Sequence, residues 1–122
     1  MRWKEESIVL SVRNFGEGAR IVTVLNRTWG KTCGLVKNLR QVIQLGDISD
    51  VTWSGKSHDQ LGVFKIENVV STFAFVFSSP LKVCAIESAC TLCINGLPEK
   101  APHEKLFESM KSLLLSIAQS GW

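Results

Sequence analysis

The sequence predicts a mainly β protein with an α-helical C-terminal part. A five-stranded antiparallel barrel is expected over residues 1–71, a linker over 72–79 and an antiparallel helix pair over 80–122. Two observations support this class. Five short apolar stretches of strand-like composition follow one another with no helical pattern between them. After Pro80 the apolar residues change from a period of two to a helical spacing.

The five strands are predicted from alternation and β-branched composition. The first, SIVLSVRNF, places Ile8, Leu10 and Val12 on one face. The second and third, RIVTVLNRTW and KTCGLVK, are rich in β-branched residues and are joined by a tight turn at Gly30. The fourth and fifth, DISDVTWSG and LGVFKIENVV, alternate again. Closing these strands into a barrel would remove the exposed edges of an open sheet.

The segment STFAFVFSSP, which follows the strands, is predicted to be an extended linker packed on the barrel. Beyond it two amphipathic helices are expected, joined by a short loop and therefore antiparallel. Their apolar stripes would be covered in part by the barrel or by further helices. The first stripe is Ile86, Cys90, Cys93 and Leu97, and the second is Leu106, Met110, Leu113 and Ile117, widened by Phe107, Leu114 and Ala118.

Length and composition are those of one small domain, or of one compact domain with a fragment of another. The chain has 122 residues, of which 45% are hydrophobic and 20% charged. It has no apolar run of about 18 residues, and its start lacks the apolar stretch of a signal peptide, so we expect a cytoplasmic protein without membrane contact. Cys90 and Cys93 fall within the first predicted helix, on its apolar face. We interpret them as buried thiols and expect no metal and no cofactor.

Basic residues gather in the N-terminal third. Residues 1–40 carry a net charge of +5 and residues 41–122 a net charge of −2. The stretch GARIVTVLNRTWGKTCGLVKN contains no acidic residue. This asymmetry indicates a polyanionic partner, although solvent-facing strand positions would account for it equally well. The candidate phosphate contacts are Arg13, Arg20, Arg27, Lys31, Lys37 and Arg40, and Trp29 is a candidate for stacking on a base or for capping the core.

Catalysis is not predicted. The glycines in FGEG and GKTCG lack the spacing of a phosphate-binding loop and do not connect a strand to a helix. Neither His58 nor His103 has a nucleophile and a carboxylate close by in the sequence. The remaining function classes are binding of nucleic acid and binding of protein.

The succession of these pieces resembles the bacterial DNA repair protein RecO family. The resemblance rests on IVL, Gly16-Glu17, IVTVL, Gly30 and GLVK, followed in order by QLGD, VTW, LGVFKIENV and LPEKAPHEKLFESM. It implies an N-terminal OB-fold followed by the start of a helical domain. It further implies a non-enzymatic, nucleoid-associated recombination mediator that binds single- and double-stranded DNA without sequence preference, anneals strands and, with RecR, loads RecA onto DNA coated by single-stranded-DNA-binding protein.

The sequence departs from this family in two places. Asn38 stands where the family has glycine after the third strand, and the basic loop that follows is short. The chain stops at Trp122 after two helices, so the surface for single-stranded-DNA-binding protein is expected to be missing. These departures leave a second hypothesis: a truncated protein-interaction module that binds RecR or a second copy of itself, with little DNA binding of its own.

Overall fold

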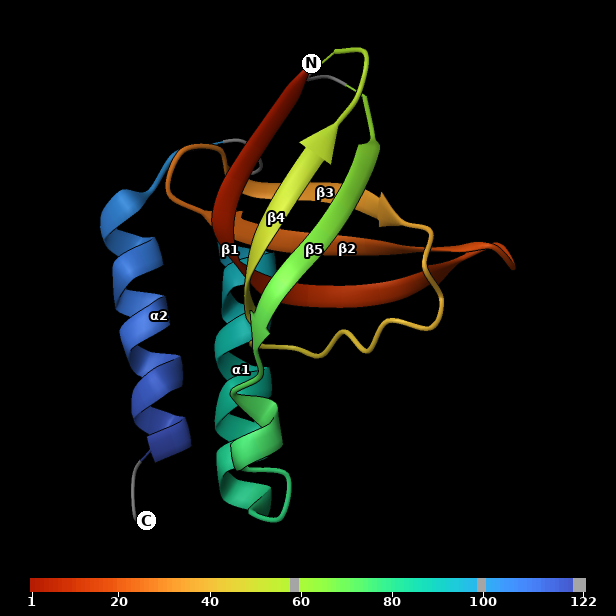
Figure 1. Ribbon diagram of the computed structural model, residues 1–122. Helices are drawn as coiled ribbons and strands as arrows, with labels where there is room; N and C mark the ends of the chain where they lie inside the picture. Colours follow the sequence, from red (N-terminus) through yellow and green to blue (C-terminus); the bar gives the residue numbers. More distant parts are fainter. Residues whose placement is uncertain (58–59, 99–100, 120–122) are drawn as a thin grey trace.

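The computed structural model describes residues 1–57, 60–98 and 101–119. Residues 58–59 of the predicted polar loop, and residues 99–100 and 120–122 of the predicted helical part, lie outside this description. Figure 1 shows a strand-rich upper part with two helices side by side below it. The elements are β1 (Arg2–Phe15), β2 (Ala19–Asn26), β3 (Gly30–Val36), β4 (Ile48–Ser54), β5 (Gly62–Val70), the 3-10 turn η1 (Phe73–Phe75), α1 (Pro80–Gly96) and α2 (Glu104–Gln119).

The strands close in the order β1-β2-β3-β5-β4, with β1 paired to both β2 and β4. A bulge between Val9 and Ser11 bends the long β1, which lets its two halves pair with different neighbours. The prediction of five strands followed by two helices is confirmed. The prediction that all pairs are antiparallel is wrong, because β3 and β5 pair in parallel at Gly34–Gly62 and Leu35–Val63. The arrangement is OB-like.

One apolar cluster fills the space enclosed by the strands. Gly34 is required here, because a Cβ at this position would lie 2.7 Å from atoms of the Phe64 ring. The ring therefore lies directly against the β3 backbone. The cluster consists of Val9, Val22, Val24, Val36, Val51, Trp53, Phe64 and Ile66.

A second cluster joins the outer side of the strands to the helices. From the strands it takes Ile8, Leu10, Leu25 and Ile48, and α1 contributes Ile86, Cys90 and Cys93 as predicted. The buried stripe of α2 is Phe107, Met110, Leu114 and Ile117. Leu113, expected at the centre of that stripe, is 47% exposed. The barrel thus covers much of both helices, and none of the described helices is long and apolar enough to cross a membrane.

The segment between β5 and α1 is compact where an extended linker was predicted. The Val76 N–H donates to the Phe73 carbonyl at 3.0 Å, which closes the η1 turn. The Thr72 hydroxyl donates to the Gly46 carbonyl at 3.0 Å, and Val76 is buried. Because these contacts fold the segment back, the alternation of its phenylalanines does not mark a strand, and Phe75 and Phe77 lie exposed.

Candidate nucleic-acid interface

An open groove lies where β3 and β5 separate. These strands share two paired positions, and beyond them the chain turns away from β5 through the loop after Val36. The groove has a volume of about 450 Å³, an apolar part to which the exposed Val63 side chain contributes, and an exposed cationic rim. It is lined by Val36, Lys37, Asn38, Arg40, Gln41, Val63, Phe64, Lys65 and Ile66. We call it the β3–β5 groove.

Three cations surround this groove: Lys37 and Arg40 from the loop, and Lys65 from β5. All three side chains are exposed. Apolar surface beside several cations suits a ligand that combines phosphates with planar rings, as a nucleotide does. The predicted residues Lys37 and Arg40 are therefore brought together here. Lys65 was not among the predicted site residues, although its alternation with the core residues Phe64 and Ile66 already indicated an outward side chain.

Arg20 holds in place the loop that forms one side of the groove. Its guanidinium donates to the carbonyls of Asn38 at 2.8 Å and Gln41 at 2.7 Å. The side-chain amide of Gln41 in turn donates to the Ile66 carbonyl of β5 at 2.8 Å. The Arg20 side chain thus fixes the loop that carries Lys37 and Arg40, and two of its N–H groups are engaged with backbone.

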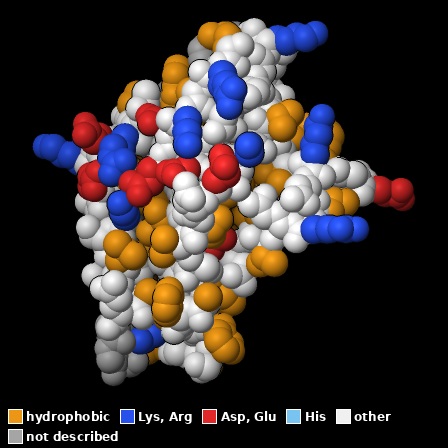
Figure 2. Space-filling model, in the orientation of Figure 1, with side chains coloured by type: hydrophobic (Ala, Val, Ile, Leu, Met, Phe, Trp, Pro, Cys, Tyr) orange, Lys and Arg blue, Asp and Glu red, His pale blue; other side chains and the backbone are white. Residues whose placement is uncertain are grey.

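Charge on the outer face of β1, β4 and β5 is arranged in rows. Lys4 pairs with Thr52, which pairs with Lys65, and side chains paired in this way point to the same side of a sheet. The next row holds Glu6, Asp50 and Glu67. Figure 2 shows acidic side chains in a band across the middle of this face, with Lys and Arg side chains above it. The basic surface around Lys65 therefore ends at an acidic border.

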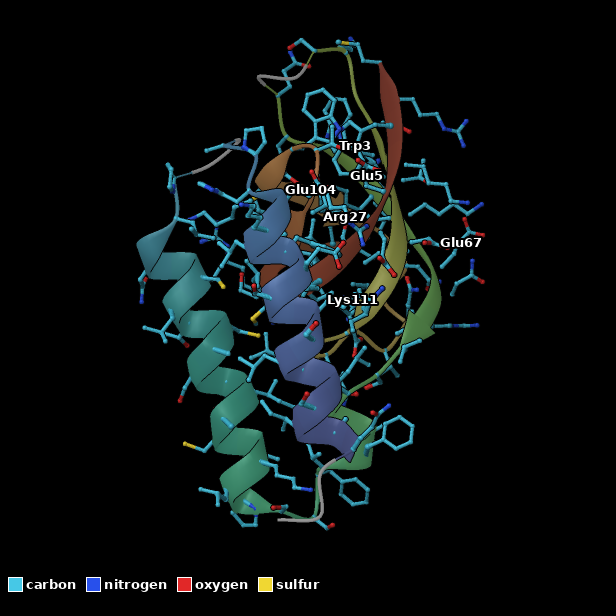
Figure 3. All side chains as sticks on the ribbon, turned by 90° about the vertical axis from the view of Figure 1, so that its left-hand side faces the viewer. Trp3, Glu5, Arg27, Glu67, Glu104 and Lys111 are labelled. Carbon is cyan, nitrogen blue, oxygen red and sulfur yellow. The ribbon has the colours of Figure 1, made fainter. Side chains whose placement is uncertain are left out.

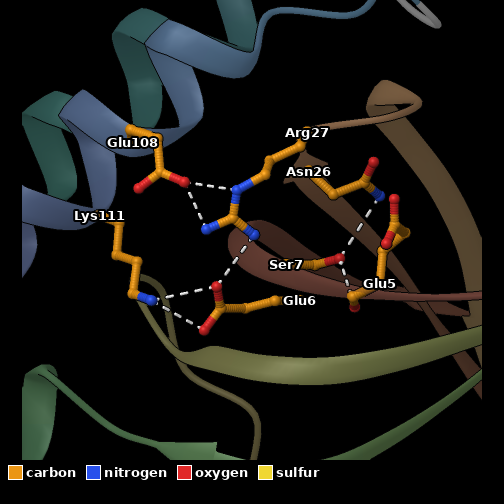
Figure 4. Close-up of polar contacts among 7 residues, drawn as sticks. All are labelled: Glu5, Glu6, Ser7, Asn26, Arg27, Glu108 and Lys111. Atoms are coloured by element: carbon orange, nitrogen blue, oxygen red, sulfur yellow. Dashed lines mark hydrogen bonds and ion pairs between the residues drawn. The ribbon is translucent and has the colours of Figure 1, made fainter.

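Arg27, predicted to contact phosphate, joins the barrel to α2. Its guanidinium forms ion pairs with Glu6 at 3.2 Å and with Glu108, and it lies 4.4 Å from the centroid of the Phe107 ring. The hydrogen bond that the Arg27 guanidinium donates to Glu108 raises the pKa of Arg27. Lys111 of α2 also pairs with Glu6, at 2.9 Å. Figure 4 shows this network, and Figure 3 places Arg27 and Lys111 between α2 and the barrel.

Lys31 is likewise directed inward. It is 9% exposed, and its ammonium donates to the Ile94 carbonyl at 2.7 Å. Carbonyls in the last turn of a helix lack partners within the helix, so a lysine there satisfies one of them. Lys31 thus holds the C-terminal end of α1 against β3. The physical reason that both Lys31 and Arg27 leave the predicted interface is the packing of the two helices over this hairpin.

Trp29 belongs to an aromatic stack at one end of the barrel. Its ring is stacked on Trp3 with centroids 6.1 Å apart, and Trp3 is stacked on Trp53 at 6.2 Å. The backbone N–H of Trp29 donates to the side-chain oxygen of Asn26 at 2.7 Å. One ring face of the half-buried Trp29 is therefore occupied by Trp3, a residue that the predicted site did not include.

Arg13 lies apart from the groove. It is exposed on the β1–β2 hairpin, opposite Ile21. The neighbouring Asn14 pairs with Arg20, the residue that reaches the loop, so Arg13 points to the other face of this hairpin. Of the seven predicted site residues, the structure gathers two at the groove.

Two cysteines of α1, Cys90 and Cys93, face the apolar cluster, whereas Cys84 is exposed. The Cys90 thiol donates to the Val9 carbonyl at 3.7 Å, and burial raises its pKa to about 12. Burial also raises the pKa of Cys93. Within the described ranges no group of three His, Cys, Asp or Glu side chains lies close enough to hold a metal ion.

Comparison with known proteins places this arrangement in a family. Residues 1–73 match the family described as "Recombination protein O N terminal". The chain belongs to the RecO family. It is similar to the DNA repair protein RecO of Rhodospirillum centenum, with 33% identity over 100% of this chain and 51% of that protein. Over the same share of the chain it is 29% identical to 52% of the Anaplasma marginale RecO.

The RecO match includes the whole β3–β5 groove. Lys37, Arg40 and Lys65 all lie within residues 1–73. The chain spans about half the length of the curated RecO proteins that it matches, and the alignment with Rhodospirillum rubrum RecO covers 99% of the chain and 50% of that relative. The family resemblance read from the sequence is confirmed.

Proposed function

We propose that this chain is a non-enzymatic, DNA-binding part of a RecO-type recombination mediator in the bacterial cytoplasm. The observation that carries the proposal is the β3–β5 groove, where three exposed cations surround apolar surface within the region that matches RecO. Lys37, Arg40 and Lys65 contact phosphates. Such contacts position DNA but do not read its sequence, so binding is independent of sequence.

The extent of the groove favours single-stranded DNA as the primary ligand. A volume of about 450 Å³ fits one or two unstacked nucleotides, whose bases lie against the exposed apolar side chain of Val63. A duplex keeps its bases stacked and would use only the rim. Arg13 adds a contact for a strand that passes around the β1–β2 hairpin. Strand annealing and RecA loading, with RecR and single-stranded-DNA-binding protein as partners, are the wider role that the family suggests.

A salt titration tests this proposal. Fluorescence anisotropy is measured with a labelled oligothymidylate and a labelled duplex between about 50 and 200 mM salt. We expect affinity to fall with salt, and Lys65→Glu to weaken binding at every salt concentration. Lys105→Glu on the exposed side of α2 is the matched control and leaves binding unchanged. Absence of salt-dependent binding contradicts the proposal.

A protein-interaction role toward RecR is the second candidate. It is favoured by apolar side chains that the described part of the chain leaves exposed near η1, where Phe75 and Phe77 are 73% and 71% accessible. A RecR-dependent shift in sedimentation without any response to DNA would support it over the first proposal.

A further inference from the structure

The outer face of β4 carries short hydroxyl side chains between two neighbouring strands. Thr52 and Ser54 point to this face, because Val51 and Trp53, which alternate with them, belong to the cluster inside the barrel. Figure 1 shows β4 between β1 and β5, and both strands pair with it. Residues that pair across these strands have side chains on the same side of the sheet, so the outward residues form rows across β4.

Two of these rows form a basic surface. The first row consists of Lys4, Thr52 and Lys65, and the second consists of Arg2, Ser54 and Val63. The rows are two residues apart, which is about 7 Å along the strands. Cationic side chains of β1 and β5 thus lie on either side of the short hydroxyl side chains of β4. We call the surface made by these two rows the β4 track.

The cations of the β4 track are free of ion pairs within the part of the chain that the structure describes. None of the described carboxylates lies within ion-pair distance of Arg2, Lys4 or Lys65. Arg27 and Lys111, by contrast, are paired with carboxylates. All three track cations have exposed side chains. Their charge is therefore available to a ligand and creates a positive potential over β4.

The β4 track is continuous with the β3–β5 groove. Val63 and Lys65 belong to both, because they line the groove and also end the two rows on β5. The next row along the strands holds the carboxylates of Asp50 and Glu67, which border the track on one side. A polyanion that leaves the groove is attracted by the track and repelled by these carboxylates. Its path across the sheet is therefore limited to the two basic rows.

We propose that a single strand of DNA leaving the β3–β5 groove continues across β4, where Lys65, Lys4 and Arg2 contact its phosphates. This inference rests on the proposed function and extends its binding site. Neighbouring strands are about 4.8 Å apart, so the backbones at Lys65 and Lys4 are separated by about 10 Å. At the duplex spacing of about 3.4 Å per nucleotide this distance spans about three nucleotides, and fewer in an extended strand.

The short side chains of β4 leave room for the DNA backbone between the cations. The exposed hydroxyl of Ser54 donates to a phosphate, as serine side chains commonly do at DNA interfaces. Such contacts do not read the bases, so the β4 track adds affinity without sequence preference. Its continuity with a groove that accommodates nucleotides favours DNA over an acidic protein segment as the ligand.

A salt titration of Lys4→Gln tests the β4 track. The ligand is a labelled oligothymidylate of about 16 nucleotides, the upper end of the site size of one OB-fold. Lys4→Gln should make the log–log slope of affinity against salt shallower by about 0.7, and Arg2→Gln/Lys4→Gln by about 1.4. The affinity deficit of the double variant relative to the wild type should then shrink about sevenfold between about 50 and 200 mM salt. Lys105→Gln removes the same charge from the exposed side of α2 and should keep the wild-type slope.

Introducing a carboxylate into the track gives a second test. Ser54→Glu places a negative charge beside Arg2 at an exposed position, and it should weaken binding of the same oligothymidylate. Ser109→Glu, at an exposed serine of α2, is the matched control and should bind like the wild type. Equal binding by Ser54→Glu and Ser109→Glu contradicts the proposal.

The two proposals fail in different ways. A wild type without salt-dependent binding refutes the DNA-binding function and the β4 track together. Salt-dependent binding by the wild type, combined with an unchanged slope in Arg2→Gln/Lys4→Gln, refutes the β4 track alone and leaves the β3–β5 groove as the site. The same unchanged slope together with a loss of binding to an acidic peptide would assign the track to a protein partner.

Discussion

The guanidinium of Arg27 lies 4.4 Å from the ring centroid of Phe107, so a residue from the end of β2 covers an aromatic side chain of α2. The Phe107 side chain is fully buried, with cation above and apolar cluster beneath. Glu6 and Glu108 hold the guanidinium in place from the barrel and from the helix. A cation that looked available for DNA in the sequence therefore fixes the position of α2.

Removing the Arg27 side chain should destabilise the protein by about 1–2 kcal/mol in Arg27→Ala. The loss combines the cation–π contact, the packing of the side-chain stem and two partly exposed ion pairs, whose contribution is small because solvent screens them. Urea unfolding measures the change. Glu108→Gln retains the arginine and its contact with the ring, and should cost less than Arg27→Ala. An equal cost for the two variants would contradict the role given to the ring contact.

One buried and one exposed position on α2 test the orientation of this helix. Phe107→Ala should cost about 3–5 kcal/mol, because it leaves a cavity at a fully buried site. Leu113→Ala, at a side chain that is 47% exposed, should change stability by less than about 1 kcal/mol. Chemical denaturation of both variants measures this difference. Comparable losses would place Leu113 in the buried stripe, as its spacing in the sequence first indicated.

The buried carboxyl of Asp47 should make stability depend on pH. Burial raises the pKa of Asp47 in the folded protein, although the Gln44 N–H donates to it at 2.9 Å, and its other oxygen has no partner in the described structure. Because the folded pKa lies above the unfolded one, the stabilising contribution is complete below the unfolded pKa of about 3.9 and is lost as pH rises through the folded pKa.

Asp47→Asn should therefore be more stable than the wild type at pH 7, and this advantage should shrink as the pH is lowered toward 4. Thermal unfolding across that pH range measures the difference in stability between Asp47→Asn and the wild type. Glu67→Gln, at an exposed carboxylate, is the control. An advantage that grows on acidification would show that the Asp47 pKa is lowered by folding.

The thiols should differ sharply in reactivity. Cys84 is exposed, whereas Cys90 is buried and its pKa is raised to about 12, so little thiolate forms at neutral pH. We expect iodoacetamide to modify Cys84 in the native protein, and Cys90 only after unfolding. Peptide mass spectrometry with and without denaturant distinguishes the two. Modification of both thiols at similar native rates would contradict the packing of α1 on β1.

Local patterns predicted the elements, while contacts between distant segments decided the roles of side chains. Alternation in β5 already placed Lys65 outward between Phe64 and Ile66. The parallel pairing of Gly34 with Gly62 could not be predicted, because it depends on the order in which five strands close. Arg27 was assigned to the interface because its partner could not be recognised from the sequence: Glu108 lies 81 residues away.

Lys31 is a second residue whose contact with a distant segment could not be predicted from the sequence. Its basic character was visible, but its acceptor, the Ile94 carbonyl, belongs to a helix 63 residues further along the chain. Lys37 and Arg40 were assigned from the same basic pattern, and in the structure both side chains are exposed in the loop after β3. They stay at the groove because no later segment of the described chain packs over them, as the helices do over Arg27 and Lys31.

The most direct test of the β3–β5 groove as the DNA site is the salt dependence of single-strand affinity, measured for the wild type and for Lys37→Gln/Arg40→Gln/Lys65→Gln. Each lost phosphate contact should reduce the log–log slope by about 0.7, so the triple variant should have a slope shallower by about 2. Lys105→Gln should keep the wild-type slope. A triple variant with an unchanged slope would show that DNA binds elsewhere on the chain.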